Sequence, residues 1–302
     1  DQAAQLAKCD LLTDMVGEFP ELQGTMGRYY ALNDGYTAEI SDAIEDHYKP
    51  RFAGDELPRS EVGVVVALAD KLETLVGMFG IGNLPTGDKD PFALRRHALG
   101  VVRMLVESAL PLHFYALTRL AFAAFPAGLL TDASAELDQF LIDRLRGYLR
   151  DTGYVVAEVD AAIYAKHMTE WHSLPKRLAA VRAFATLPEA PALASANKRI
   201  SNILKKAENV QVQVNASLLH EAAEQALHAA MQGVLPNANA QFEAGDYSAS
   251  LQTLAALRAP VDAFFDDVMV NADDPALKAN RLGLLATLHA AMNRVADLSK
   301  LA

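Results

Sequence analysis

The chain has 302 residues, of which 51% are hydrophobic and 22% are charged, a globular composition that excludes a disordered polymer. Its net charge of −11 excludes nonspecific binding along nucleic acid by bulk charge, so any site for a polyanion must be a local basic face. The single cysteine, Cys9, excludes a disulfide framework, and no apolar run reaches the roughly 20 residues that cross a bilayer. With no signal-peptide pattern at the start, these features predict a soluble cytoplasmic protein without a membrane partner.

Helical periodicity dominates the whole chain and no strand alternation is evident, which predicts an all-α protein. The chain begins without a methionine, in what reads as the middle of a helix, and this indicates a fragment. The segment 62–79 is apolar almost all round and is expected to be a buried central helix. The predicted helices span residues 62–79, 92–110, 137–154, 191–210, 218–231, 247–265 and 275–298.

The stretch "FPAGLLTDAS", residues 125–134, interrupts this periodicity with proline, glycine and a capping Thr-Asp pair. It predicts a boundary between two domains, residues 1–130 and 131–302. A second break at 166–178 is interpreted as a loop between helices.

The polar stretch "GDKDPFALRRHALG", residues 87–100, predicts a helix start at which Asp90 caps the helix and Pro91 takes the first helical position. Arg95 and Arg96 then stand side by side. They fit a solvated helix end, a tether for acidic loops, or a contact with RNA.

The clearest candidate for a binding face is "ANKRISNILKKA", residues 196–207. Its apolar residues fall on one side of a predicted helix, and no acidic residue lies between the first and last of its lysines. Cations on an exposed helix face bind phosphates and an amide reads base edges, although a merely solvated face is equally consistent with the pattern. The candidate RNA-binding residues here are Lys198, Arg199, Asn202, Lys205 and Lys206.

A second candidate group occurs in "RLRGYLR", where an aromatic ring stands among arginines. Such a ring suits stacking on an unpaired base while the cations hold phosphates. This group consists of Arg144, Arg146, Tyr148 and Arg150.

Asp10, His47 and Asp70 are the residues most typical of metal ligands in a helical hydrolase, but Cys9 stands where an adjacent histidine would complete a strong His-Asp pair. We therefore predict no bound metal. The chain carries no phosphate loop, no dinucleotide fingerprint and no Ser-His-Asp arrangement, so no catalytic residue is predicted either.

Several long strings, in a fixed order, resemble the beta subunit of bacterial glycyl-tRNA synthetase. They are "EFPELQGTMGRYYAL", "HYKPRFAGDELP", "ALADKLETLVGMFGIG", "PTGDKDPFALRRHALGVVRML", "ANKRISNILKK" and "VDAFFDDVMVNADDPALKANRLGLLATL". The resemblance covers nearly the whole chain and implies the C-terminal half of that subunit. It implies an HD-type helical domain over 1–130, in which Asp10, His47 and Asp70 are relics of a metal site. It also implies a DALR-like helical anticodon-binding domain over 131–302.

The resemblance further implies binding of tRNA(Gly) and of the synthetase alpha subunit within a heterotetramer, with no role for DNA. The ligase active site, with its ATP and Mg²⁺, is expected in the alpha subunit, and no cofactor is expected in this chain. Two alternatives remain from the residues themselves, a metal-dependent phosphohydrolase and a non-catalytic helical scaffold.

Overall fold

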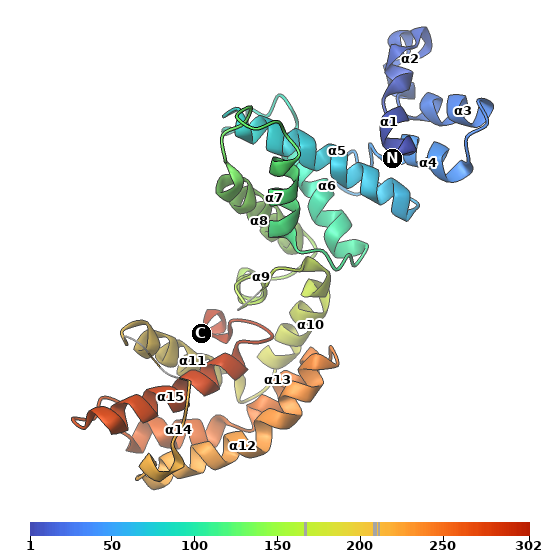
Figure 1. Cartoon of the computed structure of the whole chain (residues 1–302). Helices are drawn as coiled ribbons and strands as arrows, with labels where there is room; N and C mark the ends of the chain where they lie inside the picture. Colours follow the sequence, from blue (N-terminus) through green and yellow to red (C-terminus); the bar gives the residue numbers. More distant parts are fainter. Residues whose placement is uncertain (166–167, 208–209, 211) are drawn as a thin grey trace. The chain divides into compact units, whose positions relative to one another are not determined.

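The computed structural model describes residues 1–165, 168–207, 210 and 212–302, and its regular structure is helical (Figure 1). Within these residues the only β-type pairings are two isolated bridges, Thr86 with Lys89 and His113 with Glu170. The predicted all-α class is therefore confirmed. No described helix combines the length and apolarity that crossing a membrane requires.

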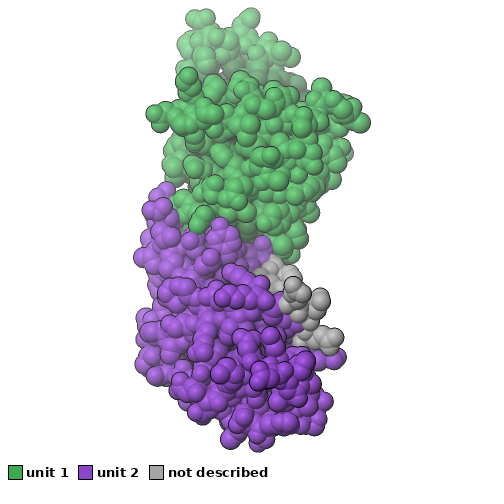
Figure 2. All heavy atoms as spheres, turned by 90° about the vertical axis from the view of Figure 1, so that its left-hand side faces the viewer, with its two compact units in different colours: residues 1–149, 169–172 green, residues 150–168, 173–302 purple. Residues whose placement is uncertain are grey.

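The chain forms two compact units, which are described separately (Figure 2). Unit 1 comprises Asp1–Leu149 and Thr169–His172, and unit 2 comprises Arg150–Met168 and Ser173–Ala302. The division falls within helix α8 (Ser134–Asp151), about 20 residues beyond the expected boundary at 130. The reason is that α8 packs into unit 1, where the Phe140 ring lies 5.2 Å from the Phe79 ring. The interrupted stretch 125–134 is a loop between two helices of unit 1.

Unit 1 is built from α-helices joined by loops and, between α1 and α3, by two short 3₁₀ turns. Thr37 and Ser60 cap two of these helices by accepting a hydrogen bond from a first-turn backbone N–H. In chain order its helices are α1 (Gln2–Leu6), α2 (Asp14–Glu18), α3 (Thr25–Asn33), α4 (Ala38–Asp46), α5 (Glu61–Gly80), α6 (Leu94–Glu107), α7 (Phe114–Ala123) and α8, with 3₁₀ turns η1 (Cys9–Leu12) and η2 (Pro20–Leu22).

Helix α5 is the centre of unit 1, as its apolar sequence predicted. It packs against α4, α6 and α7, and Leu75 and Val76 are fully buried. Helix α8 buries Leu137, Leu141 and Leu145, which share one helix face. The core of unit 1 thus follows directly from the helical spacing of its leucines and valines.

Unit 2 gathers its helices around one large hydrophobic core that includes Phe184, Leu227, Phe264 and Leu285. Its helices are α9 (Val156–Ile163), α10 (Leu174–Ala185), α11 (Ala190–Lys205), α12 (Ala222–Glu243), α13 (Tyr247–Ala255), α14 (Arg258–Asp267) and α15 (Pro275–Met292). The 3₁₀ turns are η3 (Trp171–Ser173), which spans the division between the units, η4 (Ala216–Leu218) and η5 (Leu298–Leu301).

Two predicted helix boundaries are wrong for identifiable reasons. The continuous helix expected over 247–265 is broken between α13 and α14, because Pro260 lacks an N–H and its ring clashes with the carbonyl four residues earlier. Helix α6 begins at Leu94 rather than near Pro91, because Ala93 adopts a left-handed conformation. Asp90 nevertheless caps it, since its carboxylate accepts from the N–H groups of Leu94 and Arg95. The expected loop at 166–178 includes the start of α10, and residues 166–167 lie outside the described part.

Candidate nucleic-acid interface

Helix α11 of unit 2 presents two chemically different faces. Ile200 is fully buried, and Ile203 and Leu204 pack against the core of the unit. A buried pair of amides, Asn197 and Asn293, fixes the helix further by exchanging hydrogen bonds of 2.8 and 3.0 Å. The opposite face of α11 is therefore held toward solvent.

The five candidate residues on α11 all lie on this exposed face. Four of them line one groove of about 450 Å³, together with residues of α15 and of the loop before it; they are Lys198, Arg199, Asn202 and Lys206. Lys205 is exposed on the same helix but does not line the groove. None of the described residues that line it is acidic. The structure thus unites most of the predicted group in a single concave, cationic surface, the α11 groove.

The groove contains two polar residues that the sequence pattern missed, Asn271 and Lys278. Both are exposed, and Lys278 lies on α15. They are about 70 residues away from α11 in the chain, so no local spacing could reveal them. Only the packing of α15 beside α11 brings them to the same surface.

Few side chains of the α11 groove are engaged elsewhere. The Arg199 guanidinium lies over the Phe265 ring, 4.2 Å from its centroid, and Lys198 donates to the Ala302 carbonyl at 3.2 Å. Asn202, Lys206 and Lys278 have no side-chain partner within the described part of the chain. Free ammonium groups and an amide in a groove suit phosphates and an unpaired base.

The candidate group on α8 is differently placed. Arg144, Arg146 and Tyr148 belong to unit 1, whereas Arg150 belongs to unit 2, as does the α11 groove. The Tyr148 hydroxyl donates to Glu107 at 3.1 Å, and burial together with that carboxylate raises the pKa of Tyr148 to about 12. Arg144 lies over the Phe140 ring and Arg146 is 3.9 Å from Asp143. Arg144, Arg146 and Tyr148 thus have partners within the protein. Contact between this group and RNA stays a prediction.

Arg95 and Arg96, adjacent on α6, have separate roles. Arg95 donates to the Gly87 carbonyl at 2.6 Å and so ties the preceding loop to the helix. Arg96 instead lines a cavity of unit 1. Neighbouring residues on a helix point about 100° apart, which explains the divergence.

The positions expected to be relics of a metal site are only partly engaged with other groups. Asp10 accepts a hydrogen bond from the Gly24 N–H at 2.7 Å, and the Lys8 ammonium lies 2.7 Å from an Asp70 oxygen. His47 is fully buried, and burial lowers its pKa. Among the described residues, no three His, Cys, Asp or Glu side chains are grouped to hold a metal ion. The Lys8 cation neutralises the Asp70 carboxylate, whereas Asp10 Oδ1 and His47 Nε2 are buried without a partner among the described residues. The assignment of these positions as relics of a metal site stays a prediction.

Beside these positions, Lys71 of α5 is buried with its ammonium 3.3 Å from the carbonyls of both His47 and Tyr48. Burial lowers the pKa of Lys71 to about 8. Its stem passes Gly100 of α6 so closely that a Cβ there would lie 2.6 Å from the Lys71 Cε. Gly100 is therefore the residue that makes room for the buried lysine.

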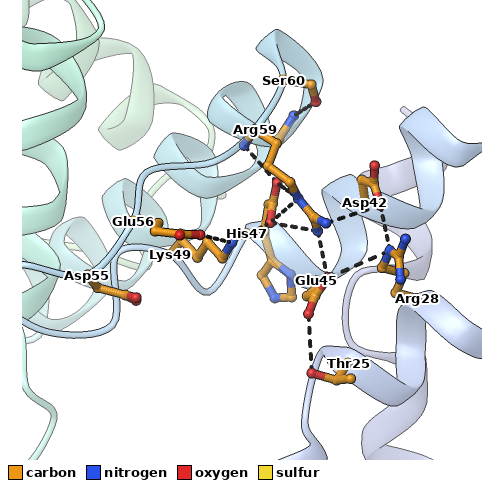
Figure 3. Close-up of polar contacts among 12 residues, drawn as sticks. Thr25, Arg28, Asp42, Glu45, His47, Lys49, Asp55, Glu56, Arg59 and Ser60 are labelled. Carbon is orange, nitrogen blue, oxygen red and sulfur yellow. Dashed lines mark hydrogen bonds and ion pairs between the residues drawn. The ribbon is translucent and has the colours of Figure 1, made fainter.

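A network of ion pairs joins α3 and α4 to the loop before α5 (Figure 3). Arg59 donates to the fully buried Asp46 at 2.9 Å and lies 2.6 Å from Glu45, while Arg28 pairs with Asp42. Burial alone would raise the pKa of Asp46, but the hydrogen bonds from Arg59 hold it below its usual value. This network uses its cations internally, unlike the α11 groove.

Known protein families match segments of the chain in each unit. A family model described as glycyl-tRNA synthetase beta subunit matches residues 1–164, and one described as DALR anticodon binding domain matches residues 193–298. The chain is 69% identical over its whole length to a glycine–tRNA ligase beta subunit of Delftia acidovorans, of which it covers 43%. It is 71% identical, over 99% of its length, to the glycine–tRNA ligase beta subunit of Polaromonas naphthalenivorans. It is 68% identical, over its whole length, to the beta subunit of Dechloromonas aromatica. The chain covers 42% of each of these two proteins.

The chain thus spans less than half the length of these curated relatives. The first family model alone covers more than half of the chain, and the expected resemblance is confirmed. The chain belongs to the family of glycyl-tRNA synthetase beta subunits.

Proposed function

We propose that the α11 groove binds the anticodon region of tRNA(Gly), as the tRNA-binding portion of a glycine–tRNA ligase. One observation carries this proposal: every residue that lines the groove, from Ser195 to Leu282, lies within the segment that matches the anticodon-binding family model. The cations of the groove would position phosphates, and Asn202 would read a base edge.

In this proposal the chain supports the ligase reaction without performing its chemistry. Attachment of glycine, with its ATP and Mg²⁺, is assigned to the alpha subunit, and the beta subunit holds the tRNA in a heterotetramer. We assign no catalytic residue and no cofactor to the chain itself. The proposed complex would act in the cytoplasm, where tRNA is charged.

The test is tRNA binding by a triple variant of groove cations, Lys198→Gln, Arg199→Gln and Lys206→Gln, over a range of salt concentrations. Each lost phosphate contact removes about 0.7 to 0.9 from the slope of log K against log salt, so the slope is expected to fall by about 2 to 3. Lys176→Gln, an exposed lysine on α10, is the matched control for a charge outside the groove. An unchanged affinity and slope in the triple variant would overturn the assignment.

A second arm compares tRNA(Gly) with the same tRNA carrying an altered anticodon. The wild-type chain is expected to bind the altered tRNA more weakly, and the triple variant is expected to discriminate less. If the chain captures the alpha subunit but binds neither tRNA, it is a scaffold instead.

A further inference from the structure

Unit 1 contains a polar cavity of about 540 Å³, within the size range of small-ligand sites. It is bounded by η2, by the chain that follows α4, by α5 and by the start of α6. Its polar lining includes Lys49, Arg51, Lys71, Arg96 and His97. All of these residues belong to unit 1, so this cavity, the α6 cavity, is independent of the α11 groove.

The cations of the α6 cavity are not equally available. Lys49 pairs with Asp46 and Glu56, and Arg51 pairs with Asp55. Arg96, in contrast, has no side-chain partner among the residues described by the structure. Arg96 is also exposed, so its guanidinium is available to a ligand.

Lys71 and His97 line the same cavity as Arg96. The Lys71 ammonium has three N–H groups and contacts two carbonyls, which leaves one donor. The Nδ1 atom of His97 is buried, and no group in the described part of the chain bonds to it. An unpaired buried polar atom costs free energy, and a ligand oxygen that accepts from it would remove that cost.

The carboxylates of the lining do not cancel this charge. Glu45 is already paired with Arg59 at 2.6 Å and accepts from Thr25 at 3.3 Å. Glu21, the other acidic residue of the lining, is exposed. The available groups of the lining therefore favour an anion.

We propose that the α6 cavity binds a phosphate monoester of up to mononucleotide size, through Arg96, Lys71 and His97, without a metal ion. The planar guanidinium of Arg96 can donate to two phosphate oxygens at once. Lys71 and His97 can bond to further oxygens, so a dianionic phosphate group fits the site better than a carboxylate ligand, which has fewer acceptor oxygens. Pro20 and Pro50 supply apolar wall for the remainder of the ligand.

The cations near the cavity are side chains of the chain itself. The Lys8 ammonium supplies a fixed positive charge at Asp70, and it lies 5.3 Å from the centroid of the Tyr48 ring, which also lines the cavity. A site whose cations are all side chains needs no divalent ion to hold a phosphate.

The test is calorimetric titration of the 302-residue chain with AMP and with inorganic phosphate, in EDTA and at constant ionic strength. Saturable one-to-one binding is expected for both. Arg96→Gln is expected to weaken it about tenfold, because it removes charge-assisted hydrogen bonds. Arg95→Gln is the matched control on the same helix, with the same change in charge, and is expected to keep binding within twofold.

Thermal unfolding separates loss of the site from loss of the fold. Phosphate is expected to raise the melting temperature of the wild type and of Arg95→Gln, but not that of Arg96→Gln, whose ligand-free melting temperature stays that of the wild type. A short RNA with a 5′-phosphate, compared with the same RNA bearing a 5′-hydroxyl, tests whether the monoester is the end of an RNA rather than a free nucleotide.

Three results would overturn the proposal: no saturable phosphate binding, binding that requires an added divalent metal, or an Arg96→Gln variant that binds as the wild type does. The α11 triple variant is expected to bind phosphate normally, so failure here is distinct from failure of the tRNA-binding proposal.

Discussion

The α11 groove and the ion-pair network of unit 1 contain the same kinds of cationic residue and use them in opposite ways. In the groove, Lys206 and Lys278 have no side-chain partner, and no acidic residue lines the surface, within the described part of the chain. In the network, Arg59 is paired with three carboxylates, those of Asp42, Glu45 and the fully buried Asp46. A basic residue is thus available to a partner only where the fold supplies no carboxylate of its own.

The largest expected effect comes from breaking the network at Asp46. Asp46→Ala leaves Arg59 and Lys49 without their shared buried carboxylate, and should cost about 3 kcal/mol or more of unfolding free energy. Urea denaturation measures this directly. Glu56→Ala removes an exposed partner of Lys49 and is expected to change the free energy by less than about 0.5 kcal/mol. Equal effects of the two substitutions would show that burial does not determine how much each ion pair contributes to the free energy of unfolding.

A second prediction concerns acid stability in unit 2, where Arg281 binds the buried Glu224. Burial alone would raise the pKa of Glu224, but the hydrogen bond from Arg281 holds it below the ordinary value. A carboxyl whose folded pKa is depressed stabilises the fold above its unfolded pKa of about 4.3, and that contribution is lost as the pH falls through the folded value. Glu224→Gln is expected to have a lower free energy of unfolding than the wild type at neutral pH. That free energy should then fall less steeply in the variant than in the wild type as the pH is lowered. An unaltered pH profile would contradict the prediction.

A third, smaller effect tests a groove residue that the sequence pattern missed. Lys278→Gln should lower the salt slope of tRNA binding by about 0.7 to 0.9 while leaving the unfolding free energy unchanged. Lys176→Gln, equally exposed on α10, should alter neither quantity. If the two substitutions behave alike, the α11 groove is not the phosphate-binding surface.

The smallest effect is expected at Phe265, whose ring supports the Arg199 guanidinium. Phe265→Leu keeps an apolar side chain but removes a contact worth about 0.5 to 1 kcal/mol, so tRNA affinity should fall about two- to fivefold. Arg199→Gln in the same background should then have less effect than it has alone. Additive effects would mean that the ring does not position the guanidinium.

Local patterns predicted much of this architecture. The apolar run over 62–79 predicted the buried central helix α5, and the separation of apolar from cationic residues over 196–207 predicted the two faces of α11. The break at Pro260 could have been anticipated from its missing N–H, but the apolar periodicity on either side obscured it.

Long-range placement could not be predicted in the same way. Lys278 reaches the groove, and Lys8 reaches Asp70, only through the packing of helices that are distant in the sequence. Arg95 and Arg96 were indistinguishable as neighbours, because their surroundings, a loop carbonyl for one and a cavity for the other, are set by the fold around α6.

The close passage of Lys71 beside Gly100 makes the two positions mutually dependent over evolution. A methyl group at position 100 gains helix propensity, about 1 kcal/mol, but displaces the lysine from the His47 and Tyr48 carbonyls. Once position 71 carries a short apolar residue, the same methyl group is harmless. We therefore expect a side chain at position 100 to be tolerated better once position 71 carries a shorter residue.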